Sequence, residues 1–179
     1  MSVQEILFEH SNKLDLINIH LLIKGGSALD NKARRGEHNL LSQLLPRGAG
    51  KYSSEMISEI IENSGCTLET EISEDEITIN FKCRKEEIYQ ILDILGCMLR
   101  DPHIDEEFFN LEKELAINSI IKYSEDPFII TFNNWRSIAY KNHPYSNNPI
   151  GDINAIKNLT RANIKKLSKE MLKREKILV

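Results

Sequence analysis

Three segments of the chain alternate between apolar and polar residues, the pattern typical of half-buried β-strands. They span residues 13–23, 66–72 and 77–83. Only the polar residues 73–76 separate the second from the third, so we predict that these two form an antiparallel hairpin. Their matched apolar faces place the hairpin in one sheet with residues 14–23. The apolar end of the chain, residues 177–179, resembles the opening of another strand.

Much of the remaining chain carries apolar residues three or four positions apart, which predicts amphipathic helices. Polar N-caps mark their beginnings: Ser53 or Ser54 begins one helix, and Asp126 followed by Pro127 begins another. The predicted helices span residues 37–45, 53–65, 85–102 and 105–123, and two more begin at Asp126 and Thr160. This order indicates an α+β fold, a mainly antiparallel sheet with helices packed on one face.

Length, charge and hydropathy indicate how many domains the chain has and which classes of protein it does not belong to. The 179 residues suffice for one sizeable core, so residues 1–179 are interpreted as a single domain. Because its last strand is only begun, we expect this domain to be a fragment of a longer, multi-domain chain. The net charge of −4 argues against a nucleic-acid partner. No apolar run approaches the ~18 residues of a membrane span.

The cysteines and the N-terminus bear on the cellular compartment. Cys66, Cys83 and Cys97 form no C-x-x-C pair, so we expect buried free thiols. Free thiols are typical of the cytoplasm or another reducing compartment. No signal peptide is visible at the N-terminus, which carries acidic residues where a basic stretch would stand.

Residues 36–48 have the frame of a zinc-protease helix without its ligands. In the motif H-x-x-E-H, two histidines on adjacent turns bind zinc, and the glutamate activates a water molecule. The corresponding positions here are Asn39, Ser42 and Gln43. Neutral amides and a hydroxyl are poor zinc ligands, and none of them acts as a general base near pH 7. The five histidines contain no pair four residues apart.

The order of elements and several short motifs together resemble the pitrilysin/insulinase family of zinc metallopeptidases, the inverzincins. The resemblance covers nearly the whole chain and points to the N-terminal, catalytic-type domain of the family. The motifs are Gly26-Ser27-x-x-Asp30, Gly36, Gly48, residues 61–65, Glu112-Lys-Glu, Asp126-Pro127, residues 143–151 and residues 156–160. The resemblance implies the half-shell fold of LuxS- and MPP-like metallopeptidases.

The resemblance also implies where the remaining site residues stand. The third zinc ligand of active members corresponds to Ser119, and Glu112 matches a carboxylate that supports the site. Both metal-binding helices have then lost their ligands, so we expect no zinc. Without metal, the simplest interpretation of Glu112 is an exposed helix charge. The peptide-binding edge strand of the family corresponds to Leu68, Glu69, Thr70 and Glu71, where Glu69-Thr70 replaces an asparagine-alanine pair.

Three functions remain open on this resemblance. The first is an inactive peptidase homologue that helps build a peptide-binding, chamber-forming assembly. Its partner is a homologous active peptidase subunit or further domains of the same chain. The second is a structural or assembly subunit that binds no peptide. The third is a working metallopeptidase with an atypical site.

Four further features have a simple structural interpretation beside a functional one. His38 is expected to be a surface or helix-start histidine, and Glu37 a favourable charge at the helix N-terminus. The basic side chains near the end of the chain are interpreted as a solvated helix face. An aromatic cluster has helical spacing and is expected in the core, with a recognition surface as the alternative. It comprises Phe128, Phe132, Trp135 and Ile138.

Overall fold

A single four-stranded antiparallel sheet runs through the molecule. The computed structural model describes residues 7–10, 14–173 and 177–178. The strands are β1 (Leu16–Lys24), β2 (Thr67–Ile72), β3 (Glu76–Arg84) and β4 (Ile177–Leu178), in the order β2-β3-β1-β4. The expected hairpin and its place beside the first strand are therefore confirmed. Four residues included in predictions lie outside the described residues. They are Lys13 and Val179, at the ends of two predicted strands, and Arg174 and Lys176, two of the basic side chains near the end of the chain.

The described residues also form seven α-helices and three short 3-10 helices. They are η1 (Ser27–Leu29), α1 (Glu37–Leu44), α2 (Ser54–Ser64), η2 (Lys85–Glu87), α3 (Ile88–Arg100), α4 (Glu106–Tyr123), α5 (Pro127–Ala139), η3 (Pro144–Ser146), α6 (Ile153–Asn158) and α7 (Arg161–Met171). The sequence pattern predicted α7, which begins after Thr160 as expected, but not the short helix α6. Among the described residues, no helix is both long and apolar enough to cross a membrane.

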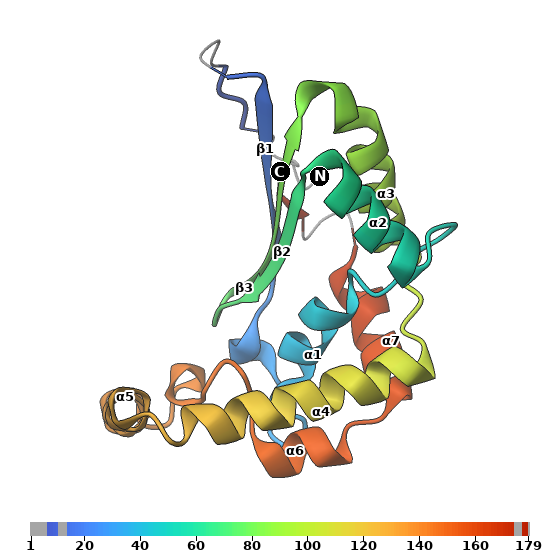
Figure 1. Cartoon of the computed structure of the whole chain (residues 1–179). Helices are drawn as coiled ribbons and strands as arrows, with labels where there is room; N and C mark the ends of the chain where they lie inside the picture. The colour runs from blue at the N-terminus through green and yellow to red at the C-terminus, as the bar shows by residue number, and fades with distance from the viewer. Residues whose placement is uncertain (1–6, 11–13, 174–176, 179) are drawn as a thin grey trace.

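The helices α1, α2, α3 and α7 lie on one side of the sheet, and α4 crosses below them in the view of Figure 1. The alternation along the strands explains this layering. Ile77, Ile79 and Phe81 of β3 point toward the helices and are fully buried, whereas Lys82 and Arg84 point away. The α+β fold with helices on one face is confirmed.

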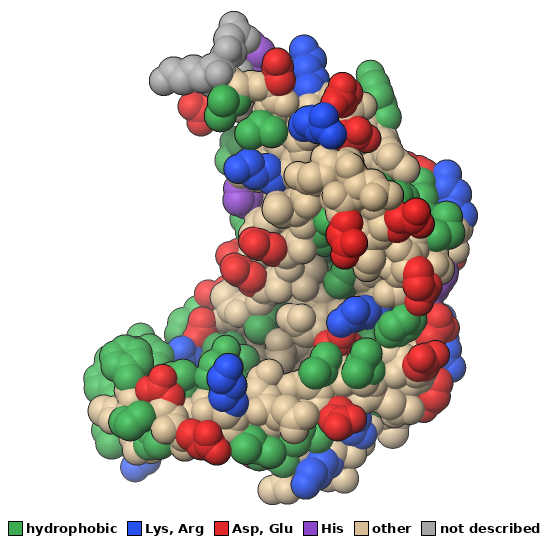
Figure 2. Space-filling view, in the orientation of Figure 1, with side chains coloured by type: hydrophobic (Ala, Val, Ile, Leu, Met, Phe, Trp, Pro, Cys, Tyr) green, Lys and Arg blue, Asp and Glu red, His purple; other side chains and the backbone are tan. Residues whose placement is uncertain are grey.

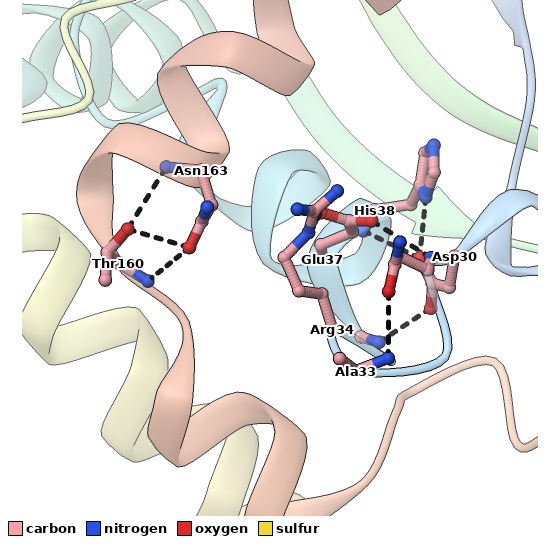
Figure 3. A network of polar contacts seen from close by, with 9 residues as sticks. Asp30, Ala33, Arg34, Glu37, His38, Thr160 and Asn163 are labelled. Atoms are coloured by element: carbon pink, nitrogen blue, oxygen red, sulfur yellow. Dashed lines mark hydrogen bonds and ion pairs between the residues drawn. The ribbon is translucent and has the colours of Figure 1, made fainter.

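The predicted helix starts are also confirmed, because their side chains bond the first free N–H groups. The Ser53 hydroxyl accepts a hydrogen bond from the Met56 N–H, and Asp126 accepts from the Phe128 N–H. Thr160 and Asn163 cap each other at the start of α7, as Figure 3 shows. Such caps contribute about 1 kcal/mol each to helix stability.

The aromatic cluster on α5 contradicts its predicted place in the core. Phe128 is 75% exposed and Ile138 is 77% exposed, and Phe132 and Trp135 are exposed as well. The Phe128 and Phe132 rings stack on each other, and the Trp135 ring lies tilted against Phe132. Helical spacing shows which side chains share a face, but a face is buried only where another element covers it. No described residue of α5 is buried.

Candidate functional site

The start of α1 is held by a close approach of two glycines. Gly36, the N-cap residue, has a φ of 98°, a left-handed conformation that side chains disfavour. A Cβ atom on Gly36 would lie 3.1 Å from the Cα of Gly151, and a Cβ on Gly151 would lie 2.6 Å from the Cα of Gly36. Two of the motif positions found in the sequence therefore meet in space, and they dock the loop of residues 143–151 on α1.

A buried polar network surrounds this helix start (Figure 3). Nδ1 of His38 donates to Oδ1 of Asp30 at 2.6 Å, and Oδ2 of Asp30 accepts from the Gly36 N–H at 2.6 Å. Glu37 accepts from the Asn31 N–H at 3.1 Å and from Nε of Arg34 at 2.7 Å. The network joins the chain before α1 to its first turn.

The expectation of a surface His38 is wrong, since the residue is only 2% exposed, although it does stand at the helix start. Glu37 is in the first turn as expected, but it too is buried. The pairing of His38 with Asp30 was not predicted from the sequence. The position of Asp30 at the end of the G-S-x-x-D motif, eight residues before His38, could have indicated it.

The network also brings possible metal ligands together. Donor atoms of Asp30, Glu37 and His38 all lie within 4.8 Å of one another. Asp30, however, already accepts three N–H groups and Glu37 two, and the Arg34 cation neutralises Glu37. The oxygen lone pairs that would bind a metal are therefore engaged by hydrogen-bond donors. The arrangement stabilises the start of the helix.

The three polar positions of α1 are engaged within the protein. The Asn39 side-chain amide donates to the Ile150 carbonyl at 3.1 Å, in the loop that docks on α1. The Ser42 hydroxyl is fully buried and donates to the Asn39 carbonyl at 2.7 Å. Gln43, half-buried, donates to the Ser42 oxygen at 3.4 Å. These hydrogen bonds stabilise the fold, and the amide and hydroxyl groups that make them provide neither a base nor an anionic ligand.

The facing helix α4, which packs against α1, carries the other two positions. Ser119 is exposed, and Glu112 lies seven residues earlier, two turns along the same side. The interpretation of Glu112 as an exposed charge is wrong, because it is 4% exposed. Its Oε1 lies 2.5 Å from Nη2 of Arg47, just beyond the end of α1. This ion pair between a half-buried arginine and a buried glutamate connects α4 to the end of α1.

Strand β2 forms an edge of the sheet and pairs only with β3 among the described residues. At the turn, the Ser73 N–H donates to the Glu76 carbonyl at 2.9 Å, which makes these two a hydrogen-bonded pair. Such pairs alternate along an antiparallel ladder, so the backbone N–H groups of Leu68 and Thr70 face the free edge. Glu69 and Glu71 are exposed, on the face opposite the helices.

One cleft of about 960 Å³ lies elsewhere, between residues 99–105 and α7. Its charged walls are formed by Arg100, Asp101, Asp105, Arg161, Lys165 and Lys169. None of the polar positions of α1, nor Ser119, lines it. This cleft is therefore separate from the surface between α1 and α4.

Comparisons with known proteins agree on the family and the fold. The family model described as Insulinase (Peptidase family M16) matches residues 5–152. The mitochondrial-processing peptidase subunit beta of Saccharomyces cerevisiae is 25% identical over 147 residues, 82% of this chain and 32% of its own. The non-peptidase homolog YmxG of Helicobacter pylori is 19% identical over 174 residues, 97% of this chain and 40% of its own.

Among solved structures, the fold is similar to the peptidase M16 inactive domain from Pseudomonas fluorescens. The TM-score is 0.84 at 18% identity, over 91% of this chain and 40% of that one. The chain thus spans well under half the length of these three proteins.

Proposed function

Because the chain belongs to the insulinase family, peptidase M16, we propose that it is a member without peptidase activity that binds peptide and helps form a chamber with a homologous active partner. That partner is a separate subunit or a further part of a longer chain. The proposal extends to this protein what the names of two similar proteins state, since one is a non-peptidase homolog and another an inactive domain.

The observation that carries the proposal is the chemistry of α1 and α4. A catalytic zinc site needs imidazole and carboxylate ligands and a base that accepts a proton from water. Asn39, Gln43 and Ser119 supply two amides and a hydroxyl in the proposed ligand positions. Ser42, in the proposed base position, is buried and already donates its proton to a backbone carbonyl.

The free edge of β2 supports peptide binding. A peptide that adds as a further strand bonds to outward-facing backbone groups, which depend little on side-chain identity. Leu68 and Thr70 offer such N–H groups, and Glu69 and Glu71 flank them with negative charge. Peptide binding can therefore persist even though the catalytic residues are replaced.

The exposed side of α5 supports a partner. We call Phe128, Phe132, Trp135 and Ile138 the α5 aromatic surface. Figure 2 shows hydrophobic side chains gathered over α5 and along the adjoining front of α4. Such contiguous apolar patches on a protein surface mark interaction sites.

Polar contacts hold α5 and η3, which packs against it, in place while the aromatic residues of α5 face solvent. Nη1 of Arg136 lies 2.6 Å from Oε1 of Glu74, and the Tyr145 hydroxyl donates to Oδ2 of Asp75 at 2.5 Å. Both acceptors lie in the turn between β2 and β3. The aromatic surface is thereby connected to the hairpin that carries the proposed peptide edge.

A structural subunit without peptide binding is the second candidate. The replacement of the family's asparagine-alanine pair by Glu69-Thr70 favours it, because it alters the strand on which peptides would add. The two candidates differ in one measurable property, the binding of peptide at β2.

A proline substitution separates them. Thr70→Pro removes an N–H that faces the free edge, where proline is tolerated, and leaves the ladder to β3 intact. We expect an extended-peptide library to protect residues 67–72 from hydrogen exchange in the wild type and not in Thr70→Pro. Thr70→Ala, which changes the same side chain but keeps the backbone N–H, is the control and should bind like the wild type. If no library peptide changes exchange at β2, the structural role is the better account. Cleavage of the peptides by the wild type would refute both.

A further inference from the structure

Two of the three cysteines lie opposite each other at the open end of the β2–β3 hairpin. The last pair of the ladder is Thr67 with Lys82. Extending this register by one step places Cys66, the residue before β2, opposite Cys83, and the two side chains do interact. Both side chains point toward the helices, and they are 7% and 1% exposed.

The position of Cys66 and Cys83 in the hydrogen-bond pattern of the ladder brings the two thiols close. Hydrogen-bonded and non-hydrogen-bonded pairs alternate from the bonded pair Ser73 and Glu76 at the turn. Cys66 and Cys83 are seven steps from that pair and therefore form a non-hydrogen-bonded pair. In such pairs the Cα atoms are about 4.5 Å apart, within the range of about 4.4–6.8 Å that a disulfide spans.

We propose that Cys66 and Cys83 form an intramolecular disulfide when the protein meets a small-molecule disulfide such as oxidised glutathione. The inference goes beyond the proposed function and does not depend on it, since it rests only on the strand register and the chemistry of thiols. The bond would close a loop around the hairpin and fasten the start of edge strand β2 to β3.

The surroundings of the two thiols determine which of them reacts first with the oxidant. Burial raises the pKa of Cys83, and the neighbouring Cys66 and Glu87 raise it further, which keeps this thiol protonated. Cys66 is the more exposed of the two and stands between the α2 cap Gly65 and the first residue of β2. Strand ends open more readily than strand centres, so Cys66 is the thiol that meets the oxidant first.

The exchange then proceeds in two balanced steps. The Cys66 thiol loses its proton to solvent, and its sulfur attacks one sulfur of oxidised glutathione. The old S–S bond breaks, and one glutathione thiolate leaves. Cys83 next loses its proton, and its sulfur attacks the Cys66 sulfur of the mixed disulfide, which releases the second glutathione. The two cysteines are oxidised, and one oxidised glutathione is reduced to two thiols.

The third cysteine belongs to a different part of the structure. Cys97 lies on α3, where its sulfur packs against Gly50, 2.9 Å from the position of a Cβ on that residue. The variant Cys97→Ser therefore leaves the hairpin pair intact and removes the competing thiol. It serves as the background for the test.

The test is a redox titration of Cys97→Ser in glutathione buffers, followed by alkylation and mass spectrometry of the intact protein. We expect both thiols to disappear together, a loss of the mass of two hydrogen atoms, and a peptide that joins residues 66 and 83. The oxidised protein should melt about 5 °C higher than the reduced one, because the cross-link restricts the unfolded chain. Hydrogen exchange at residues 67–69 should slow.

Two further variants keep the result interpretable. Cys66→Ser/Cys97→Ser should retain its single thiol under the same buffers, because Cys83 is buried. Cys83→Ser/Cys97→Ser should stop at a glutathione adduct on Cys66. The proposal is overturned if Cys97→Ser keeps both thiols, accumulates the adduct without closing the bond, or forms only disulfides between chains.

Discussion

The side chains of Asp30 and His38 meet at 2.6 Å in the interior, one in the segment before α1 and the other in its first turn. Asp30 also accepts from the backbone N–H of Gly36, so a single carboxylate orients both the histidine and the turn that begins the helix. This contact sets the direction of α1 at its N-terminus. The proposed site residues of α1 follow directly after it.

Replacement of His38 by alanine should destabilise the protein by about 2–4 kcal/mol, because the buried Asp30 carboxylate loses its charge-assisted donor. Urea denaturation followed by circular dichroism measures the loss. His20→Ala is the matched control, since His20 is exposed on the outer face of β1; it should cost less than about 0.5 kcal/mol. Equal losses in the two variants would contradict the structural role of the Asp30 contact.

The ion pair between Arg47 and Glu112 should also matter for stability, contrary to the expectation of an exposed charge. Glu112→Gln leaves Arg47 without its anion in a half-buried position and should cost about 2–3 kcal/mol. The neighbouring exposed carboxylate Glu114 provides the control, because Glu114→Gln changes the same charge by the same chemistry. A similar stability of both variants in denaturant titrations would show that the pair contributes little.

Metal binding should be recoverable if Asn39, Gln43 and Ser119 stand in the former ligand positions. The triple variant Asn39→His/Gln43→His/Ser119→Glu restores two imidazoles and a carboxylate, so it should bind one zinc ion per chain. The wild type should bind none stoichiometrically. Elemental analysis after purification without chelator compares them, and the double variant without Ser119→Glu should bind more weakly. Zinc content no higher than in the wild type would show that the proposed register is wrong.

Restored metal need not restore catalysis. Ser42→Glu adds the missing base, but Ser42 is fully buried, so the larger side chain has to displace its neighbours. Zinc content therefore tests the proposed ligand positions, whereas peptide cleavage by the variant that also carries Ser42→Glu tests the proposed base position.

The α5 aromatic surface should contribute little to the stability of the isolated chain. Phe128→Ser/Ile138→Ser should change the free energy of unfolding by no more than about 0.5 kcal/mol, since both residues are exposed. It should also lower the binding of a hydrophobic dye. Phe109→Ala, which empties a buried position on α4, should cost about 3–5 kcal/mol. A large loss of stability in the double variant would mean that α5 packs into the core.

Local sequence patterns predicted the strands, their pairing and most of the helices. Ile77, Ile79 and Phe81 alternate with polar residues, as expected for a strand with one buried face. This alternation is visible in neighbouring residues alone, so β3 could be predicted from it. Asp126 and Pro127 likewise begin α5 where their backbone chemistry permits. The motif positions could be recognised for the same reason, because each is a short run of fixed spacing.

Only the tertiary structure decided which polar residues are buried and which apolar residues are exposed. His38 and Glu112 are buried because Asp30 and Arg47, eight and 65 residues away, supply their partners. Phe128 is exposed because no described element covers its side of α5. Hydrophobic spacing is a local property, whereas burial depends on contacts between residues far apart in the chain. The sequence by itself therefore determined most of the elements and which polar residues stand in the proposed site, and the packing decided how those residues are held.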